Sequence, residues 1–146
     1  MRLWHKDLIP YLPRKQLIAQ WRECCAICSN WVNKATPNHL LVNKVLDYPK
    51  IEFYNYTMLI IQEITNRNYK ISKVSLNNFK CNYHCIPNDN AKPNFKNLFE
   101  NWHNERYLKQ CLFNLQEKYD CDGISEEEWK IIQDKFDEYL DLEALI

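Results

Sequence analysis

The sequence predicts an all-α fold, in which one compact domain over residues 1–146 contains about four helices and a long irregular loop. Glycine occurs once among 146 residues, whereas the hairpins and bulges of a β-protein usually need several glycines. Hydrophobic residues make up 46% of the chain, which is enough to bury one core at this length. Several segments also repeat their apolar residues every three or four positions, as a helix buried on one side does.

The first two predicted helices occupy residues 14–28 and 49–67. The apolar stripe of the first consists of Leu17, Ile18, Trp21, Cys24, Cys25 and Cys28. The second helix begins near Pro49, because proline suits the first turn of a helix. Its two apolar faces are Ile51, Tyr54, Met58 and Ile61 on one side and Phe53, Ile60 and Ile64 on the other. We therefore expect the second helix to be the most buried.

The second half of the chain is predicted to form a long loop followed by two helices. Residues 70–103 contain Pro87, Pro93 and many asparagines without a sustained apolar period, which indicates the loop. Helices are expected over residues 104–119 and 126–142. Their inward residues are Tyr107, Leu108, Cys111, Leu112 and Leu115 in the first, and Trp129, Ile132, Phe136 and Leu140 in the second.

Charge is distributed unevenly along the chain, although the formal net charge is zero. Residues 1–99 hold 14 Lys and Arg against 6 Asp and Glu, whereas residues 100–146 hold 5 against 13. The first part therefore carries +8 and the second −8. A basic front of this kind is compatible with nucleic-acid binding, and an ordinary solvated surface is the alternative.

The sequence contains no segment that resembles a membrane span or a signal peptide. The longest aliphatic stretch is MLII at residues 58–61, whereas a membrane-spanning helix needs roughly 20 apolar residues. The opening residues MRLWHKDLIPYLPR carry scattered charges and lack an apolar signal-peptide core. We therefore expect a cytoplasmic protein without a membrane partner, whose seven cysteines are thiols rather than a disulfide framework.

Cysteines in two parts of the chain could on paper supply four zinc ligands. Cys25 and Cys28 form a CxxC, and Cys81, His84 and Cys85 cluster later in the sequence. The second cluster lacks the tight spacing of a zinc knuckle, and free cysteine is among the most buried residue types. Core packing is therefore the favoured interpretation, and no metal is expected.

The segment DCDGISEEEW resembles the middle of a calcium-binding loop. If Gly123 occupied the sixth position of such a loop, Lys118 and Trp129 would occupy the first and twelfth, and neither can bind calcium. Ser125 and Glu128 instead have the spacing of a capping box, which predicts the start of the last helix.

The segment LIAQWRECC at residues 17–25 places an arginine and a glutamate side by side, next to the apolar stripe. A carboxylate beside a guanidinium stays ionised at neutral pH and can stabilise a developing positive charge, while the guanidinium can hold a DNA phosphate. On spacing alone such a pair is more often a solvated helix surface, and that alternative stays open for Arg22 and Glu23. Cys24 and Cys25 lie on the apolar stripe and are interpreted as core filling.

Four segments of the sequence resemble a known family or a branch of it. The pattern LxAxxRE in LIAQWRECC and the segment LDYPKIEFYNYTMLIIQEITNRNYKI are similar to the pyrimidine-dimer DNA glycosylases with abasic-site lyase activity, of the phage endonuclease V type. The opening MRLWHKDLIPYLPR and the later HNERYLKQCLFNL resemble a bacterial branch of that family. The similarity to the phage enzyme covers about the first half of the chain, and the similarity to the branch extends further.

The resemblance implies an all-α, bifunctional DNA-repair enzyme that acts on double-stranded DNA containing pyrimidine dimers or related damage. In the family, a free N-terminal α-amine attacks C1′ of the damaged nucleotide's sugar, which releases the base and forms a Schiff base. The nucleotide is extruded from a kinked duplex. No cofactor is implied, because the Schiff base is itself the electron sink. An α-amine with a pKa of about 8 is roughly 10% neutral at pH 7, some two hundredfold more than a lysine. We expect a monomer.

The resemblance also implies roles for individual residues. Glu23 corresponds to the family's catalytic glutamate, and Arg22 to its DNA-contacting arginine. The nucleophile would be the α-amine of Met1, which we expect to be retained because Arg2 is too large a neighbour for removal of the initiator. Further phosphate contacts are expected from Arg2, Arg14, Lys34 and Lys50, and Trp4 and His5 are candidates for lining the site.

The sequence departs from the family pattern at several positions. Arg2 replaces the family's terminal threonine, Ala26 a basic residue, and Gln16 a histidine. The acidic end DLEALI has no counterpart to the aromatic, lysine-rich tail of the phage enzyme. These departures affect the expected specificity for dimers more than the lyase chemistry. The alternative function is that of a non-catalytic helical protein that binds nucleic acid or a protein partner.

Overall fold

The computed structural model describes residues 2–34, 42–88 and 97–140, and within these ranges the chain is all-α, as the sequence predicts. In chain order the elements are the 3-10 helix η1 (Lys6–Tyr11), α1 (Arg14–Lys34), the 3-10 helix η2 (Asn43–Asp47), α2 (Lys50–Asn66), α3 (Lys73–Cys85), α4 (Glu105–Asp120), α5 (Glu126–Lys135) and α6 (Asp137–Leu140). None of the helices in the described ranges has the length and apolar character needed to span a bilayer.

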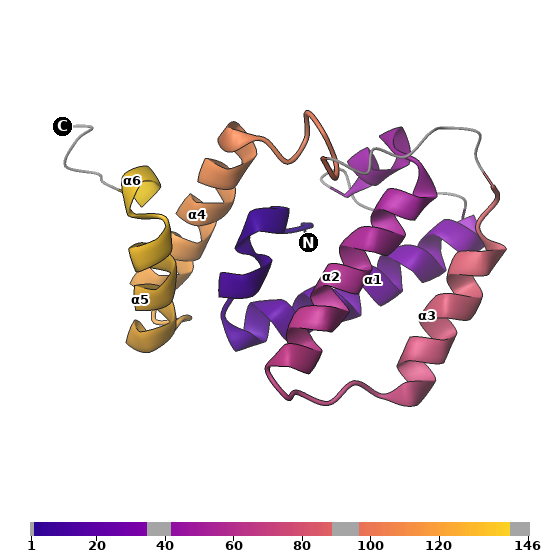
Figure 1. The fold of residues 1–146 in the computed structure, drawn as a ribbon, viewed down its shortest axis with the longest axis horizontal. Coiled ribbons are helices and arrows are strands. Elements are labelled where there is room, and N and C mark those ends of the chain that lie inside the picture. The colour runs from indigo at the N-terminus through magenta and orange to yellow at the C-terminus, as the bar shows by residue number, and fades with distance from the viewer. Residues whose placement is uncertain (1, 35–41, 89–96, 141–146) are drawn as a thin grey trace.

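The helices form two groups with the N-terminal segment between them (Figure 1). In the first group α1 packs against both α2 and α3, and in the second α4, α5 and α6 pack against one another. The 3-10 helix η1 contacts α2 of the first group and α5 of the second. Among the described residues, Lys and Arg outnumber Asp and Glu in the first group and Asp and Glu outnumber Lys and Arg in the second, so the two groups of helices differ in charge.

Helix α1 confirms the first predicted helix but continues to Lys34 instead of ending near residue 28. Trp31 extends the apolar stripe by one turn, since its side chain is buried and packs 5.9 Å from the ring of Phe53. Cys24 is completely buried and Cys25 is half-buried against the core, so both are core filling, as predicted.

Helix α2 confirms the second predicted helix and starts directly after Pro49. The face formed by Phe53, Ile60 and Ile64 is buried, and the residues of the other predicted face are half-buried. The buried face packs against α1 through Phe53 and Trp31, and the half-buried face contacts α3, where the rings of Tyr54 and Tyr83 lie 4.8 Å apart.

Helix α3 corrects the prediction of an uninterrupted loop over residues 70–103. Ser72 caps the helix by accepting a hydrogen bond from the backbone N–H of Ser75, and α3 then continues to Cys85. Its inward side chains, Phe79 and Tyr83, are one turn apart and are buried, and Phe79 packs 5.7 Å from Trp21 of α1. The low helix propensity of the many asparagines is overcome by this packing.

The last predicted helix is divided in the structure. Ser125 caps α5 by accepting from the backbone N–H of Glu128, which confirms the predicted helix start. The carboxylate of Glu128 accepts instead from the Ser125 hydroxyl and from the backbone N–H of Arg14, and so joins α5 to the start of α1. The backbone leaves the helical conformation at Phe136, whose ring packs edge-on against Tyr11, and α6 follows.

No group of three or more His, Cys, Asp or Glu side chains in the described ranges is arranged to hold a metal ion.

Candidate functional site

Hydrogen bonds to its backbone hold the N-terminal segment, residues 2–4, between α1 and α4. The side chain of Gln20 on α1 accepts from the N–H of Trp4 at 2.7 Å and donates to the carbonyl of Arg2 at 3.0 Å. The hydroxyl of Tyr107 on α4 donates to the carbonyl of Leu3. Leu3 and Trp4 are buried, so this segment occupies a defined place in the fold.

Glu23 lies one helical turn after Gln20 and receives a hydrogen bond from the same amide. The distance from Gln20 Nε2 to Glu23 Oε2 is 3.0 Å. Burial raises the pKa of the Glu23 carboxyl above its usual value, against the opposing effects of the positive N-terminus, the Gln20 hydrogen bond and Lys118. A half-buried carboxylate of this kind accepts protons more readily than an exposed one. The geometry therefore joins Glu23 and the backbone of Arg2 through one amide.

Of the predicted DNA-binding residues, Arg2 and Arg22 lie nearest to Glu23. The Arg2 guanidinium lies 5.5 Å from the Trp4 ring and 3.9 Å from the sulfur of Cys111 on α4. Arg22 is exposed and directly precedes Glu23 on α1. The backbones of both residues are therefore near Glu23, although the Arg2 guanidinium points to Trp4 and Cys111.

Two other predicted DNA-binding residues, Arg14 and Lys50, have side chains that already contact other parts of the protein. Arg14 begins α1, nine residues or about 13 Å along the helix axis from Glu23, and its guanidinium stacks 4.7 Å from the ring of Tyr69. The Lys50 amine donates to the carbonyl of Ile86 at 2.8 Å and lies 4.9 Å from the ring of Tyr83. Met1 and the side chain of Lys34 lie outside the described residues.

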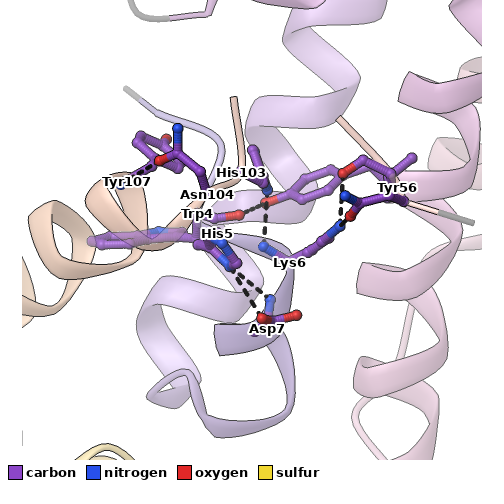
Figure 2. A network of polar contacts seen from close by, with 10 residues as sticks. Trp4, His5, Lys6, Asp7, Tyr56, His103, Asn104 and Tyr107 are labelled. Atoms are coloured by element: carbon purple, nitrogen blue, oxygen red, sulfur yellow. Dashed lines mark hydrogen bonds and ion pairs between the residues drawn. The ribbon is translucent and has the colours of Figure 1, made fainter. Parts of the chain in front are cut away.

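The two residues considered as lining of the site, Trp4 and His5, are buried and serve the structure (Figure 2). His5 accepts from the backbone N–H of Asp7 at 3.1 Å, and its ring stacks 5.1 Å from that of His103. His103 accepts from the backbone N–H of Lys6 at 3.0 Å. Burial lowers the pKa of His5 and lowers that of His103 to about 2, so both rings are neutral at pH 7 and act as fixed hydrogen-bonding groups.

A cavity of about 390 Å³ opens beside the N-terminal segment and was not predicted from the sequence. It is lined by Lys44, Asn101, Trp102, Asn104, Arg106, Tyr107 and Gln110. Tyr107 connects it to the N-terminal segment, because the same residue donates to the Leu3 carbonyl. Its lining comes from η2, from the residues before α4 and from α4 itself, and no local pattern in the sequence links these three parts.

Gln20, Tyr56 and Tyr107 were likewise missed as site residues. Tyr56 is completely buried on α2, and its hydroxyl donates to the carbonyl of Trp4 at 2.6 Å (Figure 2). A polar residue on the inward side of a predicted helix was the only available signal for Gln20.

A family model described as pyrimidine dimer DNA glycosylase matches residues 1–76. The matched region is about half of the chain and contains η1, α1, η2 and α2, and therefore Gln20, Arg22 and Glu23. No curated protein and no solved structure matches the chain.

Proposed function

Because the chain belongs to the pyrimidine dimer DNA glycosylase family, we propose that it is a DNA N-glycosylase with abasic-site lyase activity on DNA that carries pyrimidine dimers or related damage. In this proposal the α-amine of Met1 is the nucleophile and Glu23 is the acid and base. Arg2, Arg14 and Arg22 provide phosphate contacts, with weaker ones from Lys34 and Lys50. The chemistry needs no cofactor.

The observation that carries the proposal is the short connection between Glu23 and the second residue of the chain. The Arg2 carbonyl oxygen and a Glu23 carboxylate oxygen each lie 3.0 Å from Gln20 Nε2, so these two oxygens are at most about 6 Å apart. From that carbonyl the chain runs back through Arg2 and Met1 to the terminal amine, and two residues span at most about 7 Å. Because reacting atoms must approach within about 3–3.5 Å, this arrangement allows the amine and Glu23 to act on the same sugar.

The proposed reaction uses the two groups in succession. The lone pair of the neutral amine forms a bond to C1′ of the sugar while the bond from C1′ to the base breaks, and the base leaves with that electron pair. The Glu23 carboxylate stabilises the positive charge that develops on the sugar. The ring bond from C1′ to O4′ then breaks, O4′ takes up the proton that the amine nitrogen loses, and the nitrogen lone pair completes the C=N bond of the Schiff base. The carboxylate next removes a proton from C2′, the electron pair of that C–H bond forms a C2′–C3′ double bond, and the C3′–O bond breaks as the 3′ phosphate leaves with its electron pair. The raised pKa of Glu23 favours this proton transfer.

The charge distribution supports binding of DNA on the side of α1 to α3. Arg22 is exposed beside Glu23, whereas α5 begins with three consecutive glutamates, Glu126, Glu127 and Glu128. Phosphates are attracted to the first surface and repelled by the second. We therefore propose that the duplex lies against α1 and the N-terminal segment, away from α5.

Borohydride trapping on abasic-site DNA tests the proposal. The protein is incubated with an abasic duplex and borohydride, and the reduced cross-link is mapped by mass spectrometry. We expect an adduct on Met1 that disappears when the N-terminus is acetylated beforehand. The absence of any adduct from folded protein across a broad pH range would favour the non-catalytic alternative, a helical protein that only binds nucleic acid or another protein.

A further inference from the structure

The side chain of Gln20 is completely buried and contacts three parts of the fold. Its oxygen accepts from the N–H of Trp4 at 2.7 Å and lies 3.1 Å from the hydroxyl of Tyr56 on α2, whose single proton is shared with the nearer Trp4 carbonyl at 2.6 Å. Its nitrogen donates to the carbonyl of Arg2 and to the carboxylate of Glu23, both at 3.0 Å. The amide therefore uses both of its N–H donors, and its oxygen accepts from the backbone of the N-terminal segment.

The orientation of this amide is determined by its backbone partners. The N–H of Trp4 can only donate, so it must face the Gln20 oxygen, and the carbonyl of Arg2 can only accept, so it must face the nitrogen. A reversed amide would place its nitrogen against the N–H of Trp4, with donor facing donor, and its oxygen against the carbonyl of Arg2, with acceptor facing acceptor. Glu23 therefore faces an N–H donor, which favours its ionised form.

We propose that Gln20 is a positioning residue, whose buried amide holds the second residue of the chain against Glu23 and thereby sets the point from which the terminal amine attacks. This inference rests on the proposed function. Gln20 does not touch the reacting atoms. It acts through the two groups that do, because one amide nitrogen holds both the backbone next to the nucleophile and the acid–base carboxylate.

Other contacts hold the rest of the N-terminal segment, so the fold does not depend on this amide alone. The carbonyl of Leu3 accepts from Tyr107, that of Trp4 accepts from Tyr56, and the N–H of Lys6 donates to His103. Among the described contacts, by contrast, the Arg2 carbonyl has Gln20 as its donor. Loss of the Gln20 amide therefore releases Arg2, Glu23 and the N–H of Trp4, while the contacts at the carbonyls of Leu3 and Trp4 and at the N–H of Lys6 remain.

The test compares wild type with Gln20→Met, which keeps the length of the side chain but removes its hydrogen bonds. Thr57→Val is the matched control, because Thr57 is also completely buried but its hydroxyl donates within α2 to the carbonyl of Phe53. Gln20→Asn is a second variant, which keeps an amide too short to span both partners. Each protein is assayed for melting temperature, DNA affinity and the single-turnover rate of borohydride trapping on abasic DNA.

We expect Gln20→Met to trap about 10- to 100-fold more slowly than wild type, since a misplacement of about 1 Å can cost a factor of this size. DNA affinity should change less than twofold, and Thr57→Val should trap at the wild-type rate. If Gln20→Met does not fold, the same result is expected of Gln20→Asn. Trapping by a folded Gln20 variant at the wild-type rate would overturn the inference.

A second readout is independent of activity. The pKa of Glu23, followed by NMR and identified by the signal missing in Glu23→Gln, should be higher in the Gln20 variant because the donor that favours the carboxylate is lost. The other charged and titratable groups around Glu23 include the N-terminus, Lys118 on α4, Cys24, Tyr56 and the arginines Arg2 and Arg22, and all of these remain in the variant. An unchanged pKa would overturn the link between Gln20 and Glu23. A wild-type protein that forms no adduct would instead overturn the proposed function, and with it the positioning role.

Discussion

Replacement of Glu23 by glutamine tests the chemistry of the site with little change in shape. The glutamine oxygen can still accept the hydrogen bond from Gln20 Nε2, so the N-terminal segment should keep its place. The amide can neither remove a proton nor carry the negative charge. Loss of general acid–base catalysis typically costs about 10²- to 10⁴-fold in rate, or roughly 3–5 kcal/mol of activation free energy.

The same substitution has a predictable effect on stability. The folded-state pKa of Glu23 is raised above the ordinary value of 4.5, so the folded protein binds this proton more tightly than the unfolded chain does. This tighter proton binding adds to the free energy of unfolding below pH 4.5, and the contribution is lost as the pH rises through the folded-state pKa of Glu23. Because glutamine carries no charge, Glu23→Gln should melt at the same temperature as wild type or higher at pH 7, and this difference should disappear in acid.

The assay measures single-turnover cleavage of abasic and dimer-containing duplexes, with DNA affinity and melting temperature determined on the same samples. Glu127→Gln is the control, because it also removes one negative charge but lies exposed on α5, outside the site. The reasoning is refuted if Glu23→Gln cleaves damaged DNA as fast as wild type, since Glu23 would then be a solvated helix residue. A large drop in the melting temperature at pH 7 would refute the stability argument.

Further predictions concern DNA binding and the anchoring of the N-terminal segment. If about 4 phosphates are neutralised, a plot of log affinity against log salt should have a slope near −3.6, and Arg22→Ala should reduce that slope by about 0.9; an affinity insensitive to salt would contradict a basic DNA-binding surface. Lys50→Ala should alter the slope less than Arg22→Ala, because the Lys50 amine already donates to the Ile86 carbonyl. Tyr56→Phe leaves the buried carbonyl of Trp4 without its donor, which should cost about 1–3 kcal/mol and lower Tm by roughly 3–10 °C; an unchanged thermal melt would show that this hydrogen bond is dispensable.

Helices with a strong apolar period could be predicted from the sequence. The stripes of α1, α2 and α4 correspond to buried or half-buried residues in the structure, and Ser125 marks the start of α5 as its capping pattern predicts. Helix α3 was missed because only two of its 13 residues are buried, and its asparagines resemble loop composition. The break at Phe136 was missed because Ile132, Phe136 and Leu140 keep a helical spacing across it.

The sequence by itself determined the all-α class, the family and the position of the Arg22–Glu23 pair on the first long helix, since these depend on composition, on local period and on short motifs. Only the tertiary structure decided what Glu23 faces. The Gln20 amide that joins it to Arg2 depends on how the N-terminal segment crosses α1, and the anchors from Tyr56 and Tyr107 come from residues more than 50 positions further along the chain. Hydrogen bonds between such distant residues form because packing brings their backbones and side chains together, and no local pattern specifies them.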